Sequence, residues 1–179
     1  GQPCEINKIQ KLCISKNIKL IEDVSQAHGS TFYGKKLGLF GDIACFSCYP
    51  TKNLGALGDA GVIVTNSEEN AEKCKRIRQY GWGEEISSEI FGRNSRLDEI
   101  QAGILNIKLK YLDENNKIRN ELAKTYSLGL RDLPLKTPLT RKNCYHVFHL
   151  YVIKTDQRDE LVKFLNSHNI FPGIHYPYP

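Results

Sequence analysis

The chain has 179 residues, of which 40% are hydrophobic and 25% are charged, and its formal net charge is +5. This composition is typical of a globular protein with room for one domain and part of a second. No apolar run approaches the roughly 18 residues that a membrane span requires. Because acids and bases are interspersed along the chain, we expect a solvated surface and neither a membrane nor a nucleic-acid partner.

The sequence contains no methionine, even at position 1, and we interpret it as an interior fragment of a longer polypeptide. Six cysteines lie in a chain without a secretory signal, so we expect reduced thiols and a cytoplasmic location. Cys45 and Cys48 have the spacing of a metal or redox pair, but they fall in a strand-like run, where positions three apart face opposite sides. No second ligand pair follows, so we expect structural cysteines and no metal site.

The first part of the chain predicts a helix followed by short buried strands. Apolar positions recur at helical spacing over residues 5–17. Glycine-rich loop material separates the first two of three short apolar runs. These runs predict strands at 18–21, 43–47 and 61–65.

Helices dominate the next part. Ser67 is followed by two glutamates, which predicts a helix that begins there and ends at Gly81. Ser95 and Asp98 fit a capping box, and we expect the helix that follows to reach about Leu112. It continues, bent or broken, to Leu130.

A proline-bearing stretch over 133–138 precedes a predicted strand at 146–153 and a helix at 158–168. The order helix, three strands, helix predicts an α/β layer. We place a domain boundary at the proline-bearing stretch, which divides the chain into 1–132 and 133–179.

Polar residues follow two of the predicted strands. Asp23 ends the first, Ser47 ends the second, and Lys52 comes five residues later. Ligands of α/β sheets bind beyond the carboxyl ends of the strands, so these side chains can converge. A carboxylate, a hydroxyl and an amine are the groups that pyridoxal phosphate (PLP) requires. From spacing alone, a loop acceptor and a solvated lysine remain an open alternative.

The amino-acid sequences of three segments favour PLP as the ligand. The segments IEDVSQAHG (21–29), FSCYPTKNLGALGDAG (46–61) and GRNSRLDEIQA (92–102) resemble the DegT/DnrJ/EryC1/StrS family of PLP-dependent nucleotide-sugar aminotransferases. Residues 146–151 and 174–177 look like its downstream blocks. The resemblance implies an aspartate aminotransferase-like α/β fold, the PLP-dependent transferase fold type I. Residues 1–132 would be the latter part of the large domain with its connecting helix, and 133–179 part of the small C-terminal α+β domain.

The resemblance also implies roles for single residues. Lys52 would bind PLP covalently and serve as the acid and base. Asp23 would pair with the ring nitrogen, Gln26 would lie near the phenolic oxygen, and Ser47 would bind the phosphate. Asn94 matches an asparagine that reaches the phosphate from the neighbouring subunit, which implies a homodimer with shared active sites. A capping role for Asn94 is the alternative.

The reaction implied is amino transfer from an amino acid, glutamate by family analogy, to a nucleotide-linked keto-sugar. The product would serve a surface polysaccharide or a glycosylated metabolite. One alternative is a PLP- or PMP-dependent sugar dehydratase of the same family, in which histidine replaces the lysine. Another is a non-catalytic folding or interaction unit, because the family's phosphate loop and ring-stacking aromatic residue have no match in this chain.

The histidines leave alternatives open. His28 could line the substrate pocket or make a structural hydrogen bond, and the role of His175 is unassigned. We expect His146 and His149 on a sheet surface, without the spacing of metal ligands.

Overall fold

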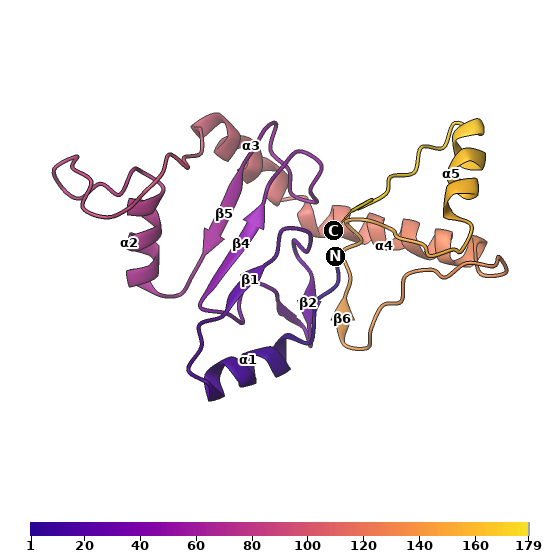
Figure 1. Ribbon diagram of the computed structural model, residues 1–179, viewed down its shortest axis with the longest axis horizontal. Helices are drawn as coiled ribbons and strands as arrows, with labels where there is room; N and C mark the ends of the chain where they lie inside the picture. Colours follow the sequence, from indigo (N-terminus) through magenta and orange to yellow (C-terminus); the bar gives the residue numbers. More distant parts are fainter. Residues whose placement is uncertain (179) are drawn as a thin grey trace.

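The computed structural model describes residues 1–178 and shows two small sheets with helices around them (Figure 1). The elements in chain order are α1 (Ile6–Ser15), β1 (Ile21–Asp23), β2 (Thr31–Phe32), β3 (Lys35–Lys36), β4 (Ile43–Ser47), β5 (Gly61–Val64), α2 (Glu68–Ile77), α3 (Glu99–Leu109), α4 (Leu112–Gly129), β6 (Cys144–Tyr145) and α5 (Arg158–Ser167).

The first sheet has the strand order β1-β4-β5. β1 runs parallel to β4, with Asp23 opposite Cys45, and β5 runs antiparallel to β4. The carboxyl ends of β1 and β4 therefore meet at one edge, as the sequence predicted. The first strand begins later than the predicted 18–21, because the backbone N–H of Leu20 donates to the Asp42 carboxylate at 2.8 Å instead of joining the ladder.

The second sheet, β3-β2-β6, lies where the sequence predicted only loop. β2 and β3 form a hairpin whose two turn residues, Tyr33 and Gly34, have positive φ angles of 49° and 77°. Such angles are those of a tight two-residue hairpin turn. β6 pairs with the other edge of β2, so that Thr31 lies opposite Tyr145.

The core consists of three small apolar clusters. Two of them pack α1, the hairpin and the first sheet together, around Ile6 and Val24. The third joins Cys48 and Ala56, on either side of Lys52, to Leu105 of α3. This cluster fixes the loop after β4 against a helix.

The helices follow the sequence with one correction. Ser67 caps α2, since its hydroxyl accepts from the Asn70 N–H at 3.2 Å. The capping box at Ser95 and Asp98 is wrong: α3 begins at Glu99, and Asp98 makes no side-chain cap. The Ser95 backbone N–H instead donates to the Arg78 carbonyl, which keeps this segment extended beside the end of α2. The expected break before α4 is confirmed.

The predicted strand at 146–153 is also wrong, because β6 ends at Tyr145. The carbonyls of His146, Val147 and Phe148 accept from side-chain amides and a guanidinium rather than from a neighbouring strand. The division at 133–138 stays a prediction, and β6, which follows it, pairs with β2. No helix within residues 1–178 is long and apolar enough to cross a membrane.

Candidate active site

Adjacent side chains at the end of β1 serve different purposes because successive residues of a strand face opposite sides. Glu22 is buried, and its carboxylate accepts backbone N–H groups from Gly38 at 2.9 Å and from Phe40 and Gly41 at 2.7 Å. It thereby fixes the loop that leads into β4. Asp23 points the other way and is exposed at the carboxyl edge of the sheet.

Asp23 is arranged to remain ionised. The Ser25 backbone N–H donates to its Oδ1 at 2.9 Å. Hydrogen bonding from Ser25 lowers the pKa of Asp23 below its ordinary value, and the positive charge of Lys52 lowers it further. Lys52 lies in the loop that follows β4, and β4 runs parallel to β1, so this loop and Asp23 leave the same edge of the sheet.

The loop that carries Lys52 is anchored at both ends. The Cys48 N–H donates to the Ala60 carbonyl and the Ala56 N–H donates to the Cys48 carbonyl, both at 2.8 Å. Within it, the Lys52 N–H donates to the Tyr49 carbonyl at 2.9 Å. Gly55 is required here because a Cβ at this position would overlap the Pro50 carbonyl oxygen. The loop is therefore a defined turn and not a free segment.

Helix α3 supports the same loop from outside. The Gln101 side-chain oxygen accepts from the Leu57 N–H at 2.9 Å, and the Lys108 amine donates to the Gly55 carbonyl. Ser47, at the end of β4, lies at the start of the loop, where its hydroxyl accepts from the Tyr49 N–H at 3.4 Å. At 3.4 Å this is a weak contact, which leaves the hydroxyl able to take a better partner.

The residue next to Lys52 belongs to a hydrogen-bonded chain of side-chain amides formed by Asn53 and Asn116. Asn53 Nδ2 donates to Asn116 Oδ1 at 2.8 Å and to the Val147 carbonyl at 2.9 Å. Asn116 of α4 is fully buried, and its own Nδ2 donates to the His28 carbonyl at 2.9 Å. The residue next to the lysine is thus fixed to α4 and, through α4, to the loop after β1.

These hydrogen bonds determine which ring nitrogen of His149 carries the proton. Because Asn53 Nδ2 donates to two oxygens, its Oδ1 faces His149 Nδ1, 3.1 Å away. His149 must donate from Nδ1 to this oxygen, which leaves Nε2 unprotonated when the ring is neutral. Burial, and to a lesser extent the charge of Lys52, lower the pKa of His149 to about 4, so the ring is neutral near pH 7.

The histidines differ from expectation. His28 is buried against Phe46, 5.5 Å between ring centroids, and neither ring nitrogen finds a hydrogen-bond partner within residues 1–178. Burial lowers its pKa to about 4. The prediction that His146 and His149 lie on a sheet surface is wrong, because their segment packs on α4, where the side chains of Asn120 and Arg119 donate to its carbonyls.

Asn94 lies apart from the other predicted site residues. It is exposed in the segment between α2 and α3, which extends outward beside α2 (Figure 1). No hydrogen bond or ion pair of the described part of the chain joins it to Asp23, Ser47 or Lys52. Gln26, in contrast, is half-buried in the loop directly after β1. Four of the five predicted residues therefore gather at one edge of the sheet.

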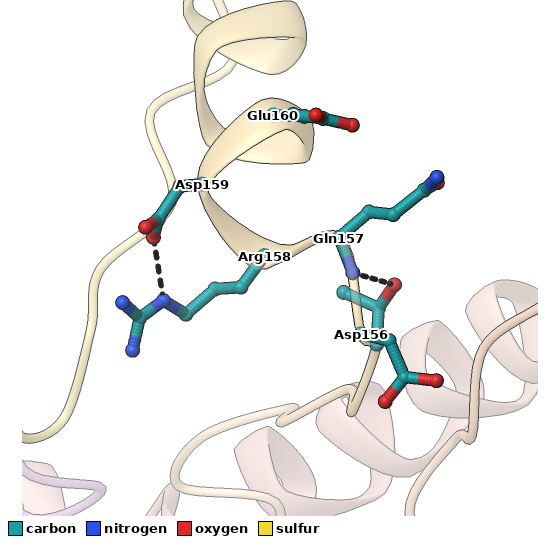
Figure 2. Close-up of a pocket in the computed structure, with 6 residues that line it drawn as sticks. Asp156, Gln157, Arg158, Asp159 and Glu160 are labelled. Atoms are coloured by element: carbon teal, nitrogen blue, oxygen red, sulfur yellow. Dashed lines mark hydrogen bonds and ion pairs between the residues drawn. The ribbon is translucent and has the colours of Figure 1, made fainter.

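A depression at the start of α5 is a poor rival for this edge. Figure 2 shows that it is lined by consecutive residues, with Arg158 paired to Asp159 at 2.7 Å and the Gln157 N–H bonded to the Thr155 hydroxyl at 3.2 Å. Ligand sites usually combine polar groups from several elements. Six neighbours from one helix start do not provide that convergence.

Comparison with known proteins identifies the family. Residues 1–179 match the DegT/DnrJ/EryC1/StrS aminotransferase family. The chain belongs to this family. It is 40% identical over 180 residues to dTDP-3-amino-3,4,6-trideoxy-alpha-D-glucose transaminase of Streptomyces venezuelae, a match that covers 100% of this chain and 48% of the relative. It is 44% identical over 179 residues to dTDP-3-amino-3,6-dideoxy-alpha-D-galactopyranose transaminase of Aneurinibacillus thermoaerophilus, with 100% and 49% covered.

The fold of this DegT/DnrJ/EryC1/StrS family member is also confirmed. The chain superposes with a TM-score of 0.94 and 40% identity on a crystal structure of S. venezuelae DesV in complex with a ketimine intermediate, covering 99% of this chain and 48% of that one. The chain thus spans about half the length of the relatives it matches.

The amide chain behind Lys52 escaped the sequence reasoning, although a signal for it exists. Leu112, Asn116 and Ala123 share one helix face at spacings of four and seven, and all three are buried. An asparagine among apolar residues on a buried face indicates a structural hydrogen-bond partner, because a buried amide is costly without one.

Proposed function

We propose that this chain is the lysine-bearing part of a PLP-dependent aminotransferase that acts on nucleotide-linked keto-sugars. The observation that carries the proposal is the meeting of two strand ends at one edge of the sheet: the ionised carboxylate of Asp23 ends β1, and the anchored loop with Lys52 follows β4. The set fits the cofactor because an ionised carboxylate can hold a ring nitrogen in its protonated form. PLP, when bound, supplies an electron-withdrawing ring that stabilises negative charge at the neighbouring carbon.

The residues then have separate tasks. Lys52 would hold the aldehyde carbon of the cofactor through its amine and, when free, would serve as the acid and base that moves a proton. Asp23 would pair with the protonated ring nitrogen. Gln26, in the loop after β1, would face the phenolic oxygen, and the Ser47 hydroxyl would donate to the phosphate. The anchored loop would keep the lysine amine within reach of the carbons between which the proton moves.

The acceptor class follows from the relatives, which are named as transaminases of dTDP-linked amino sugars. We infer a nucleotide-linked keto-sugar as amino acceptor and an amino acid, glutamate by analogy, as donor, in the synthesis of a surface polysaccharide or a glycosylated metabolite. A lysine at position 52 favours amino transfer over dehydration, since the related dehydratases replace that lysine with histidine.

The proposal includes a homodimer in the cytoplasm. Asn94 is exposed and makes no hydrogen bond with Lys52 of its own chain. It would reach the cofactor phosphate of the partner subunit. Six cysteines without a disulfide within residues 1–178 are consistent with a reducing compartment.

The first test is Lys52→Ala in the full-length protein. Without the amine, the visible absorbance of the bound cofactor and turnover should both disappear, because no other lysine follows the end of β1 or β4 in this way. Absorbance spectra and mass analysis of reactions with a panel of nucleotide keto-sugars and glutamate measure the two effects. Lys16→Ala, which removes an exposed amine after α1, is the matched control and should change neither. Retention of both properties in Lys52→Ala would refute the proposal.

A further inference from the structure

The segment between α2 and α3, here called the arm (residues 78–96), is folded by contacts within its own chain. The Arg93 N–H donates to the Ile77 carbonyl at 2.8 Å, and the Ser95 N–H donates to the Arg78 carbonyl at 2.9 Å. The backbone on both sides of Asn94 is therefore fixed to the end of α2. Glu89, farther out, pairs with Arg76 at 2.6 Å and ties the outer part of the arm to the same helix.

The side chain of Asn94 has a defined orientation. Arg96 Nε donates to Asn94 Oδ1 at 3.1 Å. A guanidinium has donors and no acceptor, so only the oxygen of the amide can face it favourably. The amide nitrogen consequently points away from Arg96. It makes no hydrogen bond among residues 1–178, and both of its N–H groups remain for an external acceptor.

Arg96 is itself restrained. Its guanidinium carbon lies 6.0 Å from the centre of the Tyr80 ring, and that ring stands 5.1 Å from the ring of Trp82. A cation at this distance over an aromatic face is attracted by the ring quadrupole. The guanidinium thus lies over the Tyr80 ring while it contacts Asn94, and Trp82 packs against that ring.

We propose that Arg96 is a positioning residue, which holds the Asn94 amide so that its two N–H donors face the cofactor phosphate of the partner subunit. The inference rests on the proposed function, in which Asn94 acts across the dimer. An unrestrained amide turns easily and presents its oxygen to an anion about as readily as its nitrogen, and the oxygen would repel phosphate. Fixing the amide in advance removes that unproductive orientation.

The test uses the full-length dimer, freed of cofactor, and compares the dissociation constants of PLP and of pyridoxal, which lacks the phosphate. Asn94→Ala should raise the PLP constant on the order of tenfold, as expected for loss of a hydrogen bond to a charged group. Arg96→Met should weaken PLP binding about twofold, because a freely turning amide has its nitrogen towards the phosphate in only about half of its orientations. Both should leave the pyridoxal constant unchanged, because pyridoxal offers no phosphate to Asn94.

Matched variants separate the roles. Arg93→Met removes an exposed arginine of the same arm whose side chain makes no hydrogen bond to Asn94, and it should affect neither ligand. Arg96→Lys keeps the positive charge but loses the planar donor, so it should resemble Arg96→Met. If Arg96→Met proves unstable, Arg96→Lys decides. Combined with Asn94→Ala, the Arg96 change should add nothing, since its effect passes through the amide.

The outcomes distinguish the two proposals. Unchanged PLP binding in Asn94→Ala would remove Asn94 from the phosphate site and defeat the shared-site part of the proposed function. Weakened binding in Asn94→Ala with normal binding in both Arg96 variants would overturn the positioning role alone. An additive loss in the double variant would mean that Arg96 contacts the ligand directly, which also overturns it.

Discussion

Histidines around Lys52 are neutral because their surroundings lack the water that would solvate a charge. His28 is the clearest case, with 2% of its surface exposed and both ring nitrogens buried. Its backbone, not its ring, is used by the fold, through the bond from Asn116. The ring of His28 therefore fills space and makes an apolar contact with Phe46. It also places a titratable group inside the domain.

That group predicts a dependence of stability on pH. Burial lowers the pKa of His28 from 6.5 to about 4 in the folded protein. Between these values the unfolded chain binds more protons, so the free energy of unfolding falls as pH decreases from about 6.5 towards 4. For this side chain the loss at pH 4.5 is about 2 kcal/mol.

Urea unfolding at pH 7 and pH 4.5 measures the effect. His28→Gln, which cannot titrate, should reduce the difference between the two pH values by about that amount, whatever its own effect on stability. His168→Gln, at an exposed position after α5, should leave the difference as it is in the unchanged protein. An equal pH dependence in both variants would contradict the assignment to His28.

At the scale of elements, the arm depends on a close approach of two backbone segments. Gly81 has a φ of 74°, and a Cβ there would overlap the Ile90 carbonyl oxygen, while Gly92 lies equally close on the other side. Gly103 of α3 has the opposite surroundings, since nothing lies within 4 Å of its Cβ position.

Replacing Gly81 and replacing Gly103 with alanine should therefore have opposite effects on stability. Gly81→Ala should disrupt the arm, weaken PLP binding as Asn94→Ala does, and increase proteolytic cleavage between residues 78 and 96. Gly103→Ala should leave the arm intact and stabilise α3 by roughly 0.5–1 kcal/mol, because alanine favours a helix more than glycine does. Limited proteolysis and denaturant unfolding report the two effects. An intact arm in Gly81→Ala would show that the close approach is dispensable.

Elements with a strong local signal could be predicted from the sequence, and elements made by distant partners could not. The strand 43–47 and the Ser67 cap depend on their own residues. β6 contains two residues and exists because it pairs with β2, far earlier in the chain, which no local pattern records. The same holds for the site: Asp23, Ser47 and Lys52 follow strand ends, but Asn53 and Asn116 meet only in the folded chain.

For the whole molecule, the proposed two-fold dimer predicts complementation. In a symmetric dimer each subunit gives the same residues to its partner. A mixture of Lys52→Ala and Asn94→Ala subunits, assayed at a PLP concentration too low to fill Asn94→Ala sites, contains mixed dimers in which one site has both defects and the other has neither. Random exchange makes about half of the dimers mixed, so activity should recover to about a quarter of that of the unchanged protein.

Subunit exchange must be verified with distinguishable tags, and each variant assayed alone gives the background. If Asn94 acts within its own chain, every site in the mixture carries a defect. Activity no greater than the sum of the separate variants, after verified exchange, would then exclude the shared site.

The pairing of β2 with β6 has a consequence for biosynthesis. Thr31 leaves the ribosome long before Tyr145, and at about 5–20 residues per second the interval is roughly 6 to 23 s. During that time the β2–β3 hairpin has an open edge, which is a template for pairing with other chains. Lys35 and Lys36 lie in this hairpin, and their charges oppose such association. The protein should therefore depend on chaperones most while this edge waits for its partner.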